Sequence, residues 1–416
     1  MIPAVQHPAA IARPLAVRRP AAGRLVNTLL FVTILVSPFV RIEPAPYEGM
    51  VALLAIACFA ANISIDRRLI PLIALLVLWN VGGLFSLMPV LHDERAIPFV
   101  AVSIYLAISA ILIACLFTHD IMRRLDILQN SYVIAAVAAT LFGIVVYFFV
   151  AGGDDMMGRV RATFKDPNVF GPFLILPILL LAADFFQRGF SLWRTIVVSV
   201  LLFGLLISFS RGAWLNFGAS AAVMAGMMFL TAPTPKVRFR LIAMGAVALV
   251  LLVGLIAAAL SIDVVADMFV ERAKVTQYYD VGDGGRFTAQ ARAVPIILDH
   301  PNGVGPHQLR NYIGIDPHQV YLNAFASYGW LGGTAYLALI LSTLLVGFRY
   351  ALVRSPWGAY LIAAFAAFFG TVAEGFVIDT DHWRHFYLLL GLIWGLSVAT
   401  RNALVARRDG RREILP

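Results

Sequence analysis

One charged residue, Arg211, interrupts a long apolar stretch near the middle of the chain. The stretch reads LLFGLLISFSRGAWLNFGAS (residues 201–220), and apolar sequence continues on both sides of it. An arginine at the centre of a membrane helix costs ~2.5–3.5 kcal/mol, so charges in such segments are candidates for function. The Ser210-Arg211-Gly212 sequence predicts a break that moves the guanidinium to the membrane interface. There it either binds a ligand or anchors the chain to lipid headgroups.

A histidine stands where a long loop meets a predicted helix. In DPHQVYLNAFASYGWLGG, Asp316 suits a helix N-cap, Pro317 suits the first helical position, and Gln319 completes a capping box. These residues predict that His318 lies in the first turn of the helix. The helix dipole there disfavours imidazolium, whereas the nearby Asp316 favours it. A mostly neutral imidazole can accept a proton from a hydroxyl. The alternative is a polar interface residue beside a helix cap.

More cations are expected on the same side of the membrane as the lone arginine. Arg286 follows DVGDGG and is predicted to begin a helix, unless it is only a solvated loop charge. The segment GRVRATFKDPNVFG adds Arg159, Arg161 and Lys165, and Asn168 is expected to begin a membrane span. The guanidinium fork of arginine matches phosphate oxygens and stays charged. Cations from three segments, together with a histidine, would suit a diphosphate held at the membrane surface.

Acidic residues and the remaining histidines give a weaker signal. Asp154 and Asp155 are adjacent, but the outer histidines lack the spacing of metal ligands, so we expect neither a metal nor another cofactor. Glu374, near the outer end of a span, and the loop DTDHWRH (residues 379–385) are open to two interpretations. They line a cleft for an acceptor, or they are ordinary interface polar groups.

The elements that must position these residues are membrane helices. Of the 416 residues 61% are hydrophobic and 13% are charged, against about 25% charged in a soluble domain, and mean hydropathy is +0.85. Backbone groups in the lipid core must bond within a helix. The sequence therefore predicts an all-α transmembrane bundle, a single membrane domain over residues 1–416. We expect about 12 spans, at approximately 25–40, 47–64, 69–90, 97–117, 131–151, 168–186, 195–209, 213–230, 241–261, 319–347, 357–378 and 385–400.

Lysine and arginine residues are divided unevenly between the two sides of this bundle. Twenty of the 32 fall in one set of loops and tails, so by the positive-inside rule that side is cytoplasmic, with both termini and the basic tails 1–24 and 401–416. Most of the others lie in 152–167, at Arg211 and in a long outer loop, 262–318. We expect short helices in that loop, one of them kinked or broken at Pro295. The net charge of +9 thus reflects membrane topology and does not indicate nucleic acid.

Taken in order, these motifs resemble those of the O-antigen ligase and O-antigen polymerase superfamily of C-type membrane glycosyltransferases. The matching elements are RATFKDPNVFGPFL, SFSRGAW, HPNGVGP and PHQVYLNAFASYGWLGG, over roughly residues 155–345. One departure is Gln319, where the family usually has Asn after the histidine. The resemblance implies a bacterial inner-membrane enzyme with its active site on the periplasmic face. Such an inverting enzyme moves glycan from undecaprenyl diphosphate to lipid A-core or to a second lipid-linked glycan, without a metal.

The resemblance also implies roles for individual residues. Arg211 and Arg286 would hold the diphosphate, and His318 would activate or orient the acceptor hydroxyl. The residues that we expect to contact substrate are Arg159, Arg161, Lys165, Asn168, Gln319 and Glu374. Ligases and polymerases share these motifs, and we lean slightly towards a ligase. A transporter of lipid-linked oligosaccharides or solutes is the alternative in another class, but transporters place their charges near the bilayer midplane. Here the charges lie at the outer face, which favours an enzyme.

Overall fold

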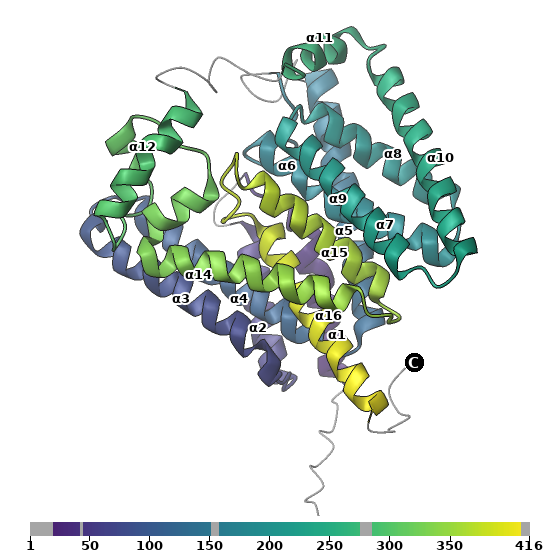
Figure 1. The fold of residues 1–416 in the computed structure, drawn as a ribbon, viewed down its shortest axis with the longest axis horizontal. Helices are drawn as coiled ribbons and strands as arrows, with labels where there is room; N and C mark the ends of the chain where they lie inside the picture. The colour runs from purple at the N-terminus through teal and green to yellow at the C-terminus, as the bar shows by residue number, and fades with distance from the viewer. Residues whose placement is uncertain (1–19, 42–44, 151–157, 275–284, 409–416) are drawn as a thin grey trace, which may run out of the picture.

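The computed structural model describes residues 20–41, 45–150, 158–274 and 285–408 (Figure 1). Within these ranges the chain is helical and contains no β-strand. The first half consists of α1 (Pro20–Leu35), α2 (Pro46–Ala60), η1 (Arg67–Leu69), α3 (Ile70–Leu87), η2 (Met88–Val90), α4 (Ala96–Leu116), α5 (Ile121–Val145), η3 (Val146–Val150), α6 (Pro167–Phe173) and α7 (Ile175–Arg188). Residues 1–19 and 409–416 of the two predicted basic tails, and the pair Asp154–Asp155, lie outside the described residues.

The second half carries the remaining membrane helices and the long loop. Its helices are α8 (Leu192–Ile207), α9 (Arg211–Thr231), α10 (Pro235–Ala259), α11 (Asp263–Arg272), α12 (Arg286–Asp299), α13 (Leu309–Ile313), α14 (Val320–Ala351), α15 (Gly358–Glu374) and α16 (Arg384–Arg408). Short helices in the loop 262–318 were expected, and α11, α12 and α13 occupy it. We expected a helix kinked or broken at Pro295. α12 instead continues through Pro295 without a break. The neighbour of Pro295 one turn back, Ala291, is exposed, so water can satisfy the carbonyl that a proline leaves without a partner.

The number and placement of the apolar helices agree with the predicted membrane bundle. Among the described residues, eight helical segments are long and apolar enough to cross a membrane. Four shorter apolar helices, α1, α2, α8 and α15, occupy the other predicted spans. The main difference is that α5 begins at Ile121, well before the expected position 131. Arg124 there is buried and donates to the carbonyls of Leu116 and His119, so this helix extends beyond the apolar segment into a polar environment.

The bundle is organised around α15, which is buried along most of its length. It contacts α7, α9, α14 and α16, and Figure 1 shows it between the α14 and α9 ribbons. Hydrogen bonds join each end of α15 to the end of a neighbouring helix. Val320 N at the start of α14 donates to Gly375 O at the end of α15 (3.0 Å). At the other end, the Trp357 indole before α15 donates to Thr400 on α16 (2.8 Å). The first turn of α14 and the last turn of α15 therefore lie at one end of the bundle.

The contact between α3 and α14 depends on aromatic packing and on a break in α14. The rings of Trp79 and Tyr328 stack with centroids 3.7 Å apart, and the Trp79 indole donates to Ser103 on α4 (3.0 Å). Just beyond, Gly329 has φ 66°, so α14 is two helices joined at a kink. The loop before α13 fills the kink, since Trp330 N donates to Pro301 O (2.8 Å). Gly329 therefore provides the break between the two parts of α14.

We predict that Gly329→Ala destabilises the protein. A side chain at a left-handed backbone position costs ~1–3 kcal/mol, and a Cβ at Gly329 would lie 2.7 Å from the Asn302 carbonyl carbon. The unfolding temperature in detergent should fall measurably. Gly218→Ala on α9 is the matched control, since a Cβ there meets nothing within 4 Å and Ala is the better helix former. Equal unfolding temperatures for the two variants would contradict the prediction.

Candidate functional site

The predicted break around Arg211 exists and fixes the start of α9. Phe209 has a positive φ of 47°, and the Ser210 hydroxyl accepts from Ala213 N (3.3 Å), which caps the helix. Arg211 is thus the first residue of α9, at its positive dipole end. Its Nη1 donates to the carbonyl of Lys274 (2.9 Å), just after α11. The arginine therefore ties the bundle to the long loop.

The basic segment before α6 packs against this break. Arg159 is buried; its Nε donates to Ser208 O (3.2 Å) and its Nη2 donates to Asn168 Oδ1 (2.7 Å). Asp166 caps α6 by accepting from Asn168 N (2.8 Å), so the helix begins at Pro167, one residue before the expected start. Arg159 and Asn168 therefore hold the segment in place. Two further predicted contact residues in this segment are the half-buried Arg161 and the exposed Lys165.

Glu374, the last residue of α15, reaches the first turn of α9. The residue is 4% exposed, and its Oε2 accepts from the Asn216 side chain (2.7 Å). A Cβ on Gly212 would lie 2.7 Å from Glu374 Oε1, so only glycine after Arg211 allows this approach. Oε1 is buried and has no hydrogen-bond partner among the described residues. The end of α15 is therefore in direct contact with the turn that carries Arg211.

The residues that follow Glu374 form a turn that we call the 374–379 turn. Val377 N donates to Glu374 O (2.9 Å), and the Val377 carbonyl accepts from Arg286 Nη1 (2.8 Å). Arg286 is the first residue of α12, as predicted, with Gly285 as its N-cap. The long loop therefore contacts the turn through one of the predicted arginines.

His318 lies on the same turn, although not in the conformation that its sequence predicts. α14 begins at Val320, with Gln319 at the N-cap and no side-chain capping bond. The predicted capping box from Asp316 to Gln319 does not form. His318 has φ 45°, a left-handed conformation that residues of an α-helix do not adopt. The Pro317 carbonyl accepts instead from Gln290 on α12 (3.0 Å). His318 therefore precedes the helix, and for a non-glycine residue this backbone is strained, a feature that is concentrated at functional sites.

The side chain of His318 faces a carboxylate. Its Nδ1 lies 3.7 Å from Asp379 Oδ2, and more than half of the imidazole surface is exposed. The side-chain interaction with Asp379 raises the pKa of His318 above its ordinary value; burial and the Arg286 charge act against this shift, and Asp316 supports it. The imidazole is therefore governed by the Asp379 carboxylate, which orients the ring and raises its basicity, and not by the helix dipole.

We predict that Asp379→Asn lowers the pKa of His318 towards its ordinary value. The amide removes the negative charge that stabilises imidazolium and keeps nearly the same shape. An NMR titration of histidine-labelled protein in detergent would measure the shift. Asp381→Asn is the control, since Asp381 pairs with His382 (3.0 Å). A His318 pKa that is unchanged in Asp379→Asn, or lowered equally in both variants, would show that the pairing is not the cause.

Comparison with known families adds to this geometry. Residues 196–337 match the family model described as O-antigen ligase. This part of the chain is therefore similar to the O-antigen ligase family. The O-antigen ligase match covers about a third of the chain, from α8 into α14, and includes Arg211, Arg286 and His318. No curated protein matches the chain.

Two of the residues that complete the site lie outside the O-antigen ligase match. Glu374 was predicted from its position near the end of a span. Asp379 was not singled out as the partner of His318; the only signal was the polar composition of the loop DTDHWRH. His318 and Asp379 are separated in sequence by the whole of α14 and α15. No local pattern in the sequence can reveal such a pairing.

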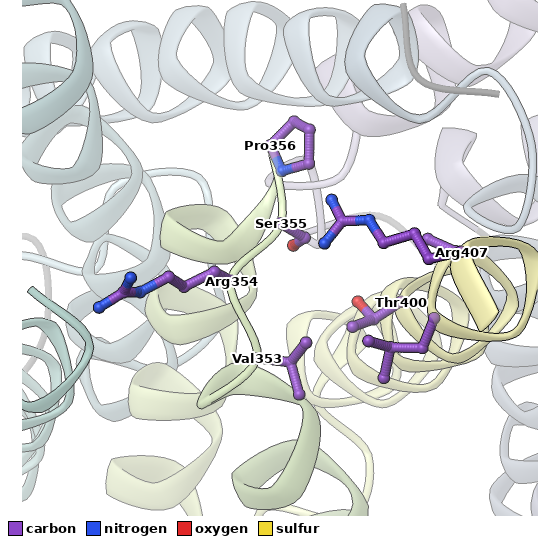
Figure 2. Close-up of a pocket in the computed structure, with 8 residues that line it drawn as sticks. Val353, Arg354, Ser355, Pro356, Thr400 and Arg407 are labelled. Atoms are coloured by element: carbon purple, nitrogen blue, oxygen red, sulfur yellow. The ribbon is translucent and has the colours of Figure 1, made fainter. Parts of the chain in front are cut away.

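The pocket in Figure 2 lies at the opposite end of the same helices. Its lining comes from the α14–α15 connection and the last turns of α16, where Arg407 extends towards Ser355 and Arg354 points away; the full set is Val353, Arg354, Ser355, Pro356, Thr400, Ala403, Leu404 and Arg407. The site around the 374–379 turn lies instead beside the start of α14 and the end of α15. This pocket is therefore separate from the candidate site.

Proposed function

We propose that this protein is a membrane glycosyltransferase that moves glycan from undecaprenyl diphosphate to an acceptor hydroxyl at the periplasmic face. One observation carries the proposal: the 374–379 turn brings together the three residues predicted to act. It pairs with His318 through Asp379, accepts a hydrogen bond from Arg286, and contacts Gly212 beside Arg211 through Glu374. The turn thus bears a base and one guanidinium group, and Arg211 directly precedes the glycine that approaches it. This reaction requires a base and fixed cations. Similarity to the O-antigen ligase family supports the same class.

The reaction that these groups would perform balances as follows. The acceptor oxygen forms a bond to the anomeric carbon, the bond from that carbon to the diphosphate oxygen breaks, and its electron pair leaves with the diphosphate. His318 takes the acceptor proton; because Nδ1 faces Asp379, Nε2 is the nitrogen that receives it. Attack opposite the leaving group inverts the anomeric centre.

The leaving diphosphate gains negative charge as the bond breaks, and fixed cations stabilise that charge. In this proposal Arg211 and Arg286 are these cations. Their side chains come from two segments and are already oriented by carbonyl acceptors, at Lys274 and Val377. Donors that are positioned before the reaction need no reorganisation during it. The chemistry then uses guanidinium groups where other transferases use a metal.

We propose that the remaining predicted contact residues belong to the same site. Lys165 is exposed, and Gln319 adjoins His318, so both can meet a sugar or a phosphate directly. Arg161 is half-buried on the same segment as the buried Arg159 and its partner Asn168. We propose that this segment contacts the donor. We also propose that the buried Glu374 positions the first turn of α9, which carries Arg211. The uneven distribution of Lys and Arg supports an inner-membrane location with both termini cytoplasmic.

The acceptor is the point at which a ligase differs from a polymerase, and we propose the ligase, with lipid A-core as acceptor. Deletion of the gene followed by electrophoresis of lipopolysaccharide tests this. Full-length glycan that stays on the carrier and fails to join lipid A supports the ligase. Single repeats on lipid A would instead assign a polymerase. An unchanged ladder, or transport of lipid-linked glycan by the purified protein without transfer, would overturn the enzyme class.

A further inference from the structure

The loop helix α12 has an apolar stripe that the rest of the chain does not cover. With about 100° per residue, Phe287, Val294 and Leu298 fall on one face, and these side chains are 53%, 44% and 59% exposed. A different face, with Ala293 and Ile297, is buried against α14. This helix therefore has a second apolar face beyond the one that its packing requires.

The exposed half of α12 is itself divided into an apolar and a charged part. Arg292 and Asp299 are exposed and lie together at the far edge of this exposed half, with Ala291 and Pro295 between them and the apolar stripe. A helix that is simply solvated would mix these residue types around its exposed surface. A helix that lies in the membrane interface separates them, with apolar side chains towards the acyl chains and charges towards water.

The stripe is continuous with surface that the membrane helices present to lipid. The Trp330 indole on α14 donates to Ile297 O on α12 (3.0 Å), so Leu298 lies next to that contact. Trp330 and Leu331 are exposed on α14, as are Phe85 and Met88 at the end of α3. Figure 1 shows α12 crossing the N-terminal end of α14. The exposed apolar residues of α12 thus adjoin exposed apolar residues of α14.

The length of α14 places this contact at the edge of the hydrocarbon. Its 32 residues amount to about 48 Å of helix, whereas the hydrocarbon core is ~30 Å thick. The part after the Gly329 kink is long enough to span the core alone, so Trp330 falls at the membrane surface. Tryptophan is enriched at that depth. α12, which is bonded to Trp330, must lie at the same level.

We propose that α12 is an interfacial helix that rests on the bilayer through Phe287, Val294 and Leu298. This contact with the bilayer holds the start of α12, and with it Arg286, at the depth of lipid headgroups. If the proposed function is right, this is also the depth at which the diphosphate of a membrane-embedded carrier lies. The placement of α12 in the membrane does not depend on that function.

Depth-dependent quenching tests the placement on the whole protein. Single cysteines at Val294→Cys and Leu298→Cys, in a Cys58→Ala, Cys115→Ala background, carry a bimane label in liposomes of phosphatidylethanolamine and phosphatidylglycerol. Arg292→Cys on the charged edge is the matched control. Quenching by a headgroup-nitroxide lipid should be at least ~3-fold stronger at 294 and 298 than at 292, and quenching by aqueous iodide should follow the reverse order.

Two outcomes would overturn the proposal. Iodide quenching at 294 and 298 as strong as at 292 would place the stripe in water. Protection from both quenchers would show that protein, such as a second copy of this chain, covers it. All three substituted side chains are exposed, and if one variant fails to insert, the comparison of the remaining apolar position with 292 decides. The measurement uses no substrate, so its result is separate from that of any glycan-transfer assay.

Discussion

His318→Ala should lower the rate of glycan transfer by ~10²–10⁴-fold, the usual effect of removing a general base. The imidazole is the only base in contact with both a carboxylate and the 374–379 turn in the part of the chain that the structure describes. Because Asp379 raises its pKa, the neutral form is lost as the pH falls through that raised value. Transfer should therefore decline on acidification, and in Asp379→Asn the decline should begin at lower pH. A purified transfer assay with carrier-linked glycan measures both effects.

Backbone strain at this position provides a control that separates chemistry from folding. His318 has φ 45°, which glycine adopts at little cost. His318→Gly should therefore unfold at a higher temperature than His318→Ala and be equally inactive. His300→Ala, in the same loop, should keep transfer within a few-fold, since the imidazole of His300 bonds Ile296 O (2.8 Å) and packs on the Tyr312 ring in the described structure. Near-normal transfer by His318→Gly would exclude the histidine as base.

The membrane helices could be predicted from the sequence because a single physical rule governs them. Lipid gives the backbone no partner, so apolar runs of sufficient length must be helices. The boundaries were less predictable where the environment is not lipid. The start of α5 was missed because Arg124 looks like a loop charge, yet it is buried and bonded to carbonyls at the end of α4. Charge alone does not reveal such internal bonds.

The site was predictable in its residue types and not in its geometry. Arg286 could be placed at a helix start, and Arg211 at a break between helices, because the glycines before α12 and the Ser210-Arg211-Gly212 sequence are local signals. The conformation of His318 could not be predicted, because a capping sequence is only a local preference. Here the bonds of Val320 N to Gly375 and of Gln290 to Pro317 hold the chain in another conformation. The pairing with Asp379 is likewise a product of tertiary structure.

Arg211→Ala and Arg286→Ala should each lower transfer by ~10²–10³-fold, the cost of removing one fixed donor to a developing anion. Both residues are first in their helices, α9 and α12, and both adjoin the 374–379 turn, through Gly212 and Val377 respectively. Lysine should restore only part of the rate at either position, because it keeps the charge and loses the bidentate fork. Rates measured at saturating acceptor would isolate the donor step.

The double variant distinguishes one shared diphosphate from two separate ligands. If both guanidinium groups bind one diphosphate, removing the first already misplaces it, so the combined loss should be smaller than the product of the single losses. If the losses multiply, the arginines act on different groups, and the proposed convergence is wrong. Arg292→Ala, on α12 but with its side chain exposed, should change the rate less than a few-fold. A large loss there would attribute the Arg286 effect to the charge of α12 as a whole. Of the two arginines on α12, Arg286 is the one whose side chain bonds the turn that also carries the partner of His318.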